Sequence, residues 1–388
     1  METETLLAPP PIEETLAENT LVENTLVEDG SWLRRHQDML LITATGLAIG
    51  GLGVWLSFLG NPRNAGICIS CFMENLAGAL SLHGNARMEY VRPELIGFIL
   101  GAAVMAFLAR EFRSEGGSSP ILRFLGGGIL IVGCGVFMGC PIRMALRLGA
   151  GDFTAASGFV GLVAGVWLGF VFLKRGFYLG EASPMPLING LILPLIAVGT
   201  LVAVLMKSPL LQSSASGPGA ERAPFAIALG AGLLIGALAQ RSRFCITGNI
   251  GNFLAARDYK MASGVLAMLG SAVIVSLLLG SFHPGFDAQP GSNLAYGWSF
   301  LGMGLVGITS VLIGGCPFRQ VVLASQGSTD AAAAVLGMLG GAALVQTWSI
   351  GSTNVGPTPA GKIATLLSFA FILIMGLVLR MRESEQPA

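Results

Sequence analysis

The chain has 388 residues, of which 53% are hydrophobic and only 11% are charged, and its formal net charge at pH 7 is zero. Because a soluble domain carries about 25% charged residues, this composition excludes an ordinary soluble domain and indicates an integral membrane protein. The balanced charge gives no indication of a nucleic-acid partner.

The first 38 residues are the polar exception. They contain the acidic near-repeat "ETLAENTLVENTLVED" and lack the basic stretch and apolar core of a secretory signal peptide. Short acidic segments of this kind are usually solvated and carry no specific chemistry. We therefore expect residues 1–38 to form a disordered cytoplasmic tail.

Ten apolar runs follow, each close to the roughly 20 residues that a helix needs to cross a bilayer. Their approximate ranges are 39–60, 93–109, 121–139, 154–173, 187–206, 224–240, 261–280, 296–314, 331–348 and 363–380. A Ser-, Pro- and Gly-rich stretch after the fifth run is typical of a linker. The sequence thus predicts an all-α polytopic membrane protein, with a first transmembrane repeat at 39–206, a linker at 207–223 and a second repeat at 224–382.

The two halves of the chain resemble each other. A shift of 176 positions aligns Cys140, Pro141, Arg143, Gly161 and Gly165 with Cys316, Pro317, Arg319, Gly337 and Gly341, and a shift of 177 aligns Cys68 and Asn75 with Cys245 and Asn252. Weak internal symmetry of this kind is typical of duplicated transporter halves. Since each half holds five spans, an odd number, we expect two inverted-topology repeats.

The basic residues indicate how the protein is oriented. With the N-terminus in the cytoplasm, 14 of the 22 Lys and Arg residues fall on the cytoplasmic side. Membrane proteins carry such an excess in their cytoplasmic segments. We therefore expect a multi-pass protein of the plasma (inner) membrane with both termini in the cytoplasm.

The motif Gly-Cys-Pro-x-Arg occurs once in each half, directly after an apolar run. Its proline suits the first position of a helix, because proline has no N–H to donate. Cys140 and Cys316 then fall at the N-cap, where free backbone N–H groups and the positive end of the helix dipole lie. With Arg143 and Arg319 in the first turn, each motif predicts a broken central helix and an anion-binding pocket with a thiol at its edge.

A second pair of cysteines, Cys68 and Cys245, also precedes an apolar helix in each half. We expect inverted symmetry to place Cys68 and Cys140 toward one membrane face, and Cys245 and Cys316 toward the other. A thiol is a weak donor and a polarizable acceptor, which suits a soft sulfur or selenium species. The sequence therefore predicts four thiols along one path.

Several further residues are candidates for the same site. Cys71 forms a Cys-x-x-Cys pair with Cys68, which suits a redox pair, a soft-metal clip or a contact with substrate. We expect Asn75, Asn252 and Gln320 to donate hydrogen bonds to an oxyanion.

Other polar positions have competing interpretations. Arginine in or beside a span is costly, so Arg147, Arg241 and Arg243 are functional candidates, although the last two equally suit topology anchors. Cys134 is best interpreted as a small buried hydrophobe. No Walker A, EF-hand, zinc-protease or dinucleotide motif is present in the sequence. We therefore predict no catalytic residue, no metal ligand and no cofactor.

Four segments carry a family resemblance: "GICISC", "GCPIR", "RSRFCITGNI" and "GGCPFRQVVLASQGSTDAA". On a duplicated chain of Gly-rich spans, they resemble the YeeE/YedE family of membrane transporters from about Asn61 to the last span. The Cys-Pro-x-Arg form is most similar to the YedE branch associated with selenium metabolism. Members of the wider family take up thiosulfate through an hourglass-shaped protein whose central cysteines pass the ion along by S–H hydrogen bonds. The resemblance implies that role for Cys68, Cys140, Cys245 and Cys316.

We therefore expect a permease, and not an enzyme, for a small sulfur or selenium species such as thiosulfate, selenite or selenide. Its expected partners are that species and the lipid bilayer, with a cytoplasmic thiol acceptor protein as a further candidate. Two alternatives stay open. The first is a membrane thiol redox protein that uses Cys68 and Cys71 on a chalcogen species, and the second is a soft-metal permease. The redox alternative lacks a haem, flavin or quinone signature, and arginines beside the thiols favour an anion over a metal cation.

Overall fold

The computed structural model describes residues 32–257, 259–287 and 289–379 of the chain. The chain divides into two compact units, Met1–Leu40 and Leu41–Ala388. Helix α2 (Trp32–Phe58) begins in the first unit, and every other element described below belongs to the second. The predicted tail is therefore helical from Trp32 onward, and its remaining residues, 1–31, lie outside the described part of the chain.

Each of the ten predicted spans is a helix in the structure, and four short helices lie between them. The first half holds α2, α3 (Ile69–Ala79), α4 (Pro93–Leu108), α5 (Pro120–Phe137), α6 (Pro141–Gly149), α7 (Ala155–Lys174) and α8 (Leu187–Leu205). The second half holds α9 (Phe225–Ser242), α10 (Ile246–Ala256), α11 (Tyr259–Leu278), α12 (Tyr296–Leu312), α13 (Pro317–Ser325), α14 (Thr329–Thr347) and α15 (Pro359–Val378). Long and short helices follow the same order in both halves.

The length and apolar composition of the helices suit a membrane-spanning protein. Within the described residues, nine helices or directly continuous helix pairs are long and apolar enough to cross a bilayer, and α4 is an apolar helix of 16 residues. The outer helix α8 exposes large apolar side chains, among them Ile188 at 59% and Leu195 at 54%. Such a face is stable only against lipid or another apolar surface.

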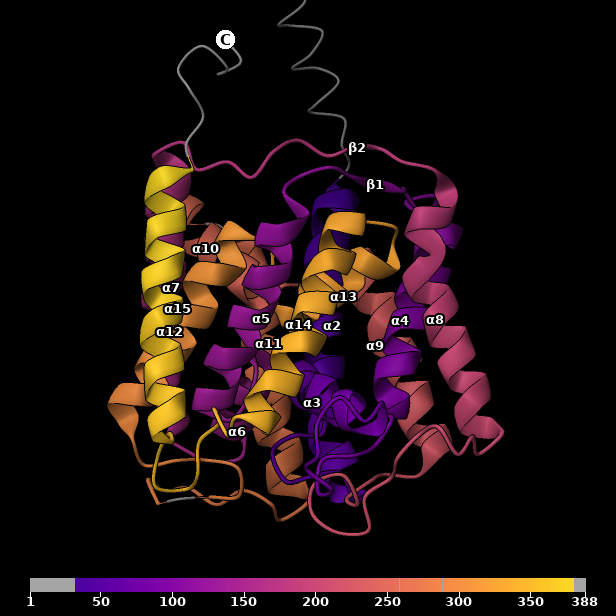
Figure 1. The fold of residues 1–388 in the computed structure, drawn as a ribbon, viewed down its shortest axis with the longest axis vertical. Helices are drawn as coiled ribbons and strands as arrows, with labels where there is room; N and C mark the ends of the chain where they lie inside the picture. Colours follow the sequence, from indigo (N-terminus) through magenta and orange to yellow (C-terminus); the bar gives the residue numbers. More distant parts are fainter. Residues whose placement is uncertain (1–31, 258, 288, 380–388) are drawn as a thin grey trace, which may run out of the picture. The chain divides into compact units, whose positions relative to one another are not determined.

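Within the described residues, short β structure departs from the predicted all-α fold. Strands β1 (Glu115–Gly116) and β2 (Ser183–Pro184) pair antiparallel, with Glu115 opposite Pro184. They lie in the loops before α5 and before α8, at the upper end of the helices in Figure 1. The strands join two connecting loops and leave the helical architecture unchanged.

The four short helices lie at different levels of the bundle. In Figure 1, α3 and α6 lie toward the lower end, and α10 and α13 lie toward the upper end. Helices α5 and α12 end just before α6 and α13 because the chain turns through left-handed residues, Met138 at φ 68° and Gly314 at φ 87°. These turns break two apolar runs in the core and leave two new helix N-termini there.

Glycines let helices of the two halves approach closely. Helix α7 packs on α12, and α5 packs on α14. A Cβ atom at Gly161 of α7 would lie only 2.1 Å from the carbonyl oxygen of Phe300, and one at Gly337 of α14 would lie 1.9 Å from that of Phe124. A shift of 176 positions converts Gly161 into Gly337 and Phe124 into Phe300. The two interfaces are therefore built from the same pair of positions, exchanged between the halves.

Candidate functional site

A first group of thiols gathers where α3 and α6 begin. Cys68 is the N-cap of α3, where its Sγ accepts the backbone N–H of Cys71 at 3.5 Å and lies 3.3 Å from the Ser70 hydroxyl. Cys140 is the N-cap of α6, is fully buried, and lies close enough to Cys68 for the two thiols to interact. The N-cap position predicted for Cys140 from its proline is confirmed.

An arginine and a third thiol complete this group. The Cys71 Sγ lies 2.7 Å from the Cys68 Sγ, and the Arg143 Nη1 donates to the Cys71 Sγ at 3.3 Å. The Arg143 Nε is buried and has no hydrogen-bond partner among the described residues. Cys68, Cys71, Cys140 and Arg143 are called the first cysteine station below. Its arginine holds a donor that an anion could use.

The second half builds a matching group at the start of α10 and α13. Cys245 is the N-cap of α10, and its Sγ accepts the Gly248 N–H at 3.4 Å and lies 3.3 Å from the Thr247 hydroxyl. Cys316 is the N-cap of α13, and the Sγ atoms of Cys245 and Cys316 are 3.6 Å apart. Both thiols are buried. The backbone geometry at Cys245, φ −154° and ψ 118°, nearly repeats the −151° and 103° of Cys68.

Arg319 belongs to this second group. It lies close enough to Cys245 and Cys316 for electrostatic interaction. Within the described part of the chain its buried Nη1 has no hydrogen-bond partner. Cys245, Cys316 and Arg319 are called the second cysteine station below. Each station thus pairs N-cap thiols with a guanidinium that holds an unused buried donor.

The glycine of the Gly-Cys-Pro-x-Arg motif makes room for its arginine. A Cβ atom at Gly139 would lie 2.5 Å from the Arg143 Cδ, and one at Gly315 would lie 2.9 Å from the Arg319 Cγ. Gly139 also adopts φ 157°, which disfavours any side chain. The arginine stem folds back over the glycine in both halves, so the five-residue motif is one structural unit.

The first cysteine station lies beside a large cavity. This cavity, about 900 Å³ in volume, is called the arginine basin; its lining includes the station residues Cys71 and Arg143, the acids Glu74 and Glu221, and Asn75, Arg63, Arg87 and Arg92. Four arginines against two acids make the lining electropositive. Such a cavity concentrates anions from solution.

Asn75 and Arg92 play a structural part in this lining. The Arg92 Nε donates to the Asn75 Oδ1 at 2.7 Å, and the other arginine nitrogens donate to Asn61 and to the carbonyls of Pro218 and Glu221. Asn75 itself is 1% exposed. The hydrogen bonds of Arg92 are therefore engaged within the protein, and Arg143 is the basin arginine with a buried unused donor.

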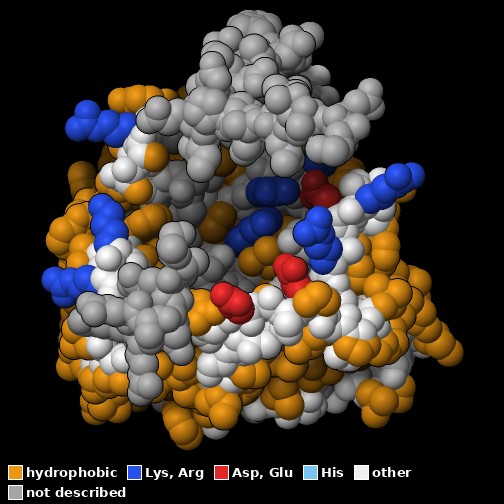
Figure 2. Space-filling view, turned by 90° about the horizontal axis from the view of Figure 1, so that it is seen from above, with side chains coloured by type: hydrophobic (Ala, Val, Ile, Leu, Met, Phe, Trp, Pro, Cys, Tyr) orange, Lys and Arg blue, Asp and Glu red, His pale blue; other side chains and the backbone are white. Residues whose placement is uncertain are grey.

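Charged side chains also surround the second cysteine station. Figure 2, which views the upper end of the bundle, shows basic and acidic side chains around a hollow within a rim of hydrophobic side chains. Arg243 and Glu111 act on Arg319 of the second station, and Arg241 and Arg243 pair with Glu111 at 3.1 and 3.9 Å. Both arginines are at least half exposed. Their exposure favours topology anchors over substrate ligands.

Two predicted amide donors occupy different environments. The Gln320 Nε2 donates to the carbonyl oxygens of Ile313 and Gly315 at 2.9 and 3.4 Å, so this amide supports the turn before Cys316. Its Oε1 is buried and unpartnered within the described residues. Asn252 is exposed on α10, which does not suit the predicted contact with an oxyanion inside the protein.

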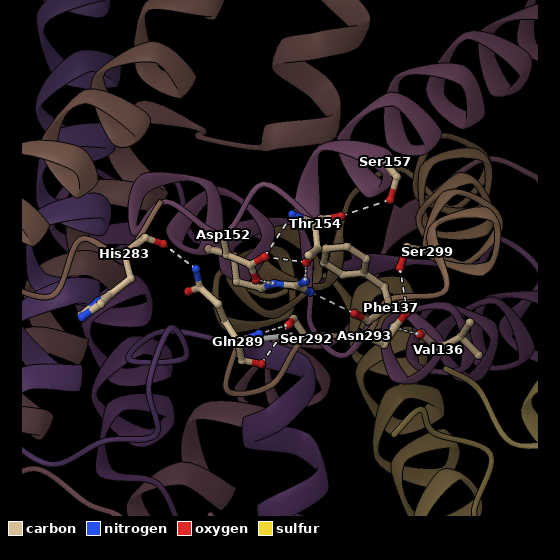
Figure 3. Close-up of polar contacts among 11 residues, drawn as sticks. Val136, Phe137, Asp152, Thr154, Ser157, His283, Gln289, Ser292, Asn293 and Ser299 are labelled. Carbon is tan, nitrogen blue, oxygen red and sulfur yellow. Dashed lines mark hydrogen bonds and ion pairs between the residues drawn. The ribbon is translucent and has the colours of Figure 1, made fainter. Parts of the chain in front are cut away.

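Arg147 is a buried structural residue. Its Nε lies 2.7 Å from the Asp152 Oδ2, its Nη2 donates to Thr154 at 2.8 Å, and its guanidinium lies over the Phe137 ring at 4.5 Å. Figure 3 shows Asp152 and Thr154 beside Phe137, with Asn293 of the 279–295 loop donating to Val136. Because its charge is fully paired, Arg147 ties α5, α6 and α7 together and is not available to a ligand.

Glu74 and Asn249 are among the buried polar residues near the stations that were not predicted as site residues. Glu74 of α3 is 9% exposed and lines the arginine basin three residues after Cys71. Asn249 of α10 is 3% exposed, and its Nδ2 has no partner among the described residues. A charged side chain within the apolar stretch "ISCFMENLAGA" was the available signal for Glu74, because such a residue is costly in a membrane. Asn249 gave no comparable signal.

Comparison with known proteins adds one finding. Residues 241–385 match a family model described as "Sulphur transport". The match covers the second half from Arg241 onward and includes the second cysteine station. No curated protein matches the chain. The match and the apolar helices together support a multi-pass membrane protein related to sulfur transport. The match also supports the resemblance to the YeeE/YedE family over this half.

Proposed function

We propose that this protein is a permease for a small sulfur or selenium oxyanion, which passes through the first and second cysteine stations in turn. The observation that carries the proposal is the repetition of one local design in the core of both halves. In each, an N-cap thiol receives a backbone N–H and lies beside an arginine with an unused buried donor. The sulphur-transport match over residues 241–385 supports a sulfur species as the cargo.

The physical steps follow from the donors on the path. The arginine basin attracts the anion by its positive charge. At the first cysteine station, Arg143 and the S–H groups of Cys68 and Cys140 replace its hydration water. Helices α3 and α13 touch, and so do α6 and α10, which brings the two stations into adjacent parts of the core. The anion then reaches Cys245, Cys316 and Arg319.

Thiols suit this passage because they bind weakly. An anion must bind well enough to enter and weakly enough to leave. An S–H group is a poorer hydrogen-bond donor than a hydroxyl or an amide. The four N-cap thiols would therefore form a series of sites that each bind the anion weakly. The two arginines and the helix N-termini supply the remaining stabilisation of the negative charge.

The proposal includes an inverted repeat. The exchanged contacts of Gly161 with Phe300 and of Gly337 with Phe124 support it, because a two-fold axis makes each contact occur twice with the partners exchanged. The lower position of α3 and α6 and the upper position of α10 and α13 support it too. With both termini in the cytoplasm of a plasma (inner) membrane, the arginine basin would face outward, which suits uptake, and a cytoplasmic thiol protein would be an acceptor.

A thiol redox protein is the second candidate. It is favoured by one observation, the 2.7 Å between the Sγ atoms of Cys68 and Cys71, which are both free thiols in this structure. A dithiol this close could reduce an oxidised chalcogen and become a disulfide. The second cysteine station lacks this feature, because Gly248 stands at the position of Cys71.

Uptake into proteoliposomes tests the proposal. We expect the purified protein to accumulate radiolabelled thiosulfate or selenite, and the double variant C140S/C316S to show no uptake above empty liposomes. Cys134 provides the matched control, because it is a buried thiol beside the first station that caps no helix, and C134S should keep most of the uptake. Absence of uptake of both anions by the folded wild type would refute the proposal, and chemical reduction of selenite without uptake would favour the redox protein.

A further inference from the structure

We propose that Glu74 binds a proton when an anion binds at the first cysteine station, so that anion binding is linked to protonation. This inference rests on the proposed function and deepens it. Glu74 projects from α3, the helix that carries Cys68 and Cys71. It lines the arginine basin together with Cys71 and Arg143. The anion and the carboxylate would therefore share one small volume.

The carboxylate of Glu74 is held by neutral groups. One oxygen accepts a hydrogen bond from the Gln346 Nε2, and the Gln346 Oε1 accepts from the Asn85 Nδ2 at 2.7 Å. The backbone oxygen of Glu74 bonds to the His83 ring at 2.9 Å. Among the described residues, no ion pair involves Glu74. Gln346 fixes the position of the carboxylate without neutralising its charge.

The charged and titratable groups that face Glu74 are few. On its own helix they are Cys68 and Cys71, on α6 Arg143, and on α5 Cys134. The loop that follows α3 contributes His83, through its ring, and α14 contributes only the neutral Gln346. Arg143 is the cation of the first cysteine station that acts on this carboxylate, and Arg63, Arg87, Arg92 and the acid Glu221 line the same basin farther along its wall.

A charge count gives the reason for a linkage. Within the first cysteine station, and without an anion, the positive charge of Arg143 offsets an ionised Glu74. An anion at Arg143 leaves the buried group with excess negative charge, and like charges in a partly buried site repel strongly. A proton from the water of the basin, taken up by Glu74, removes this repulsion. The protonated carboxyl group also gains an O–H that can donate to the anion.

Within the described residues, the second cysteine station has no acid at the position equivalent to Glu74. A shift of 177 positions takes Glu74 to Gly251. Glu111, an acid that acts on Arg319 of the second station, already pairs with Arg241 and accepts from Gln240. The proton-linked step is therefore specific to the first station, on the side of the arginine basin.

Calorimetric titration of the protein in nanodiscs with thiosulfate tests the linkage. Repeating the titration in buffers with different ionisation enthalpies gives the number of protons taken up per anion bound. For the wild type we expect close to one proton in the pH range where the free Glu74 is ionised. There the affinity should fall by up to tenfold per pH unit as the pH rises, because proton and anion binding are reciprocal.

Two variants make the test specific. Glu74→Gln keeps the hydrogen-bonding shape, and we expect it to bind thiosulfate with no proton uptake and with at least a fivefold weaker pH dependence. Glu94→Gln is the matched control, because Glu94 is also buried, at 3%, but is held by Asn61 outside the stations. It should behave as the wild type does.

Each other result has a distinct meaning. Thiosulfate binding to the wild type without proton uptake would refute the linkage and leave the proposed permease intact. Unchanged proton uptake in E74Q, or a folded E74Q that no longer binds thiosulfate, would refute the role of Glu74. No binding to the folded wild type would refute the proposed function for this anion, and the linkage with it.

Discussion

The two cysteine stations share their N-cap geometry and differ in what surrounds it. Both place a thiol against a backbone N–H, with a hydroxyl two residues later at 3.3 Å, Ser70 in one and Thr247 in the other. The first station adds Cys71, Glu74 and a cavity of about 900 Å³, whereas Gly248 and Gly251 occupy the corresponding positions in the second. In the proposed permease, the shared groups would bind the cargo and the unshared groups would control access from one side.

The largest expected effect falls on the shared thiols. We expect C140S and C316S to lower thiosulfate uptake at least tenfold each, and to similar extents, because both remove the polarizable donor at equivalent N-caps. Initial uptake rates in proteoliposomes at equal protein content measure this. A loss in one variant combined with wild-type uptake in the other would break the equivalence of the two stations.

The second largest effect should follow substitution of the two shared arginines, Arg143 and Arg319. Arg143→Gln and Arg319→Gln each remove a charged donor, and hydrogen bonds to charged groups are worth about 1.5–3 kcal/mol. We expect about a tenfold rise in the KM for the anion in either variant. Arg241→Gln is the control, because an exposed ion pair contributes only about 0–1 kcal/mol, and its KM should change less than twofold. Unaltered KM values in both station variants would remove the arginines from the path.

The thermal stability of glycine variants tests whether the α7–α12 and α5–α14 interfaces are equivalent. Gly161→Ala and Gly337→Ala push a methyl group into a facing carbonyl, and overpacking of this kind costs about 1–3 kcal/mol. We expect equal falls in the thermal midpoint of the two variants in detergent. Gly199→Ala in α8, where a Cβ meets nothing within 4 Å, should leave the midpoint unchanged or raise it. Clearly unequal falls would contradict equivalent interfaces.

The smallest effect should fall on the unshared thiol. Cys71→Ser keeps a donor beside Arg143 and leaves both N-cap thiols in place, so we expect about a twofold reduction in uptake. Complete loss of uptake in C71S, with folding retained in size-exclusion chromatography, would favour a dithiol redox mechanism over passage along the path.

Much of the fold followed from the sequence because membrane helices are specified by composition. All ten predicted spans are helices, and the breaks before Pro141 and Pro317 were predictable because proline begins a helix well and continues one poorly. The repeat was visible because the motif combines a glycine, a thiol, a proline and an arginine at fixed spacing. The pairing of thiols within each station stays consistent with the predicted path, whose role in transport is a proposal.

The surroundings of the stations were not predictable in the same way. Asn75 and Asn252 occupy corresponding positions in the two halves. The 13-residue loop between α3 and α4 covers Asn75, which bonds to Met88 and Arg92 of that loop. Only two residues separate α10 from α11, so no loop covers Asn252 in this way. Asn252 is therefore exposed. Arg147 was predicted as a functional candidate because the sequence does not show that Asp152 is its ion-pair partner. The two side chains meet only because the chain turns back after α6. Such pairings depend on tertiary contacts that no local pattern contains.

Locating the cargo itself tests the passage through both stations most directly. Crystals soaked in selenosulfate, the selenium analogue of thiosulfate, would report the anion by the anomalous scattering of selenium. We predict selenium peaks within hydrogen-bonding distance of Arg143 and the Cys68 and Cys140 thiols, and of the Cys245 and Cys316 thiols. Bound selenium found only elsewhere, with both stations empty at concentrations that saturate binding, would contradict a route along the four N-cap thiols.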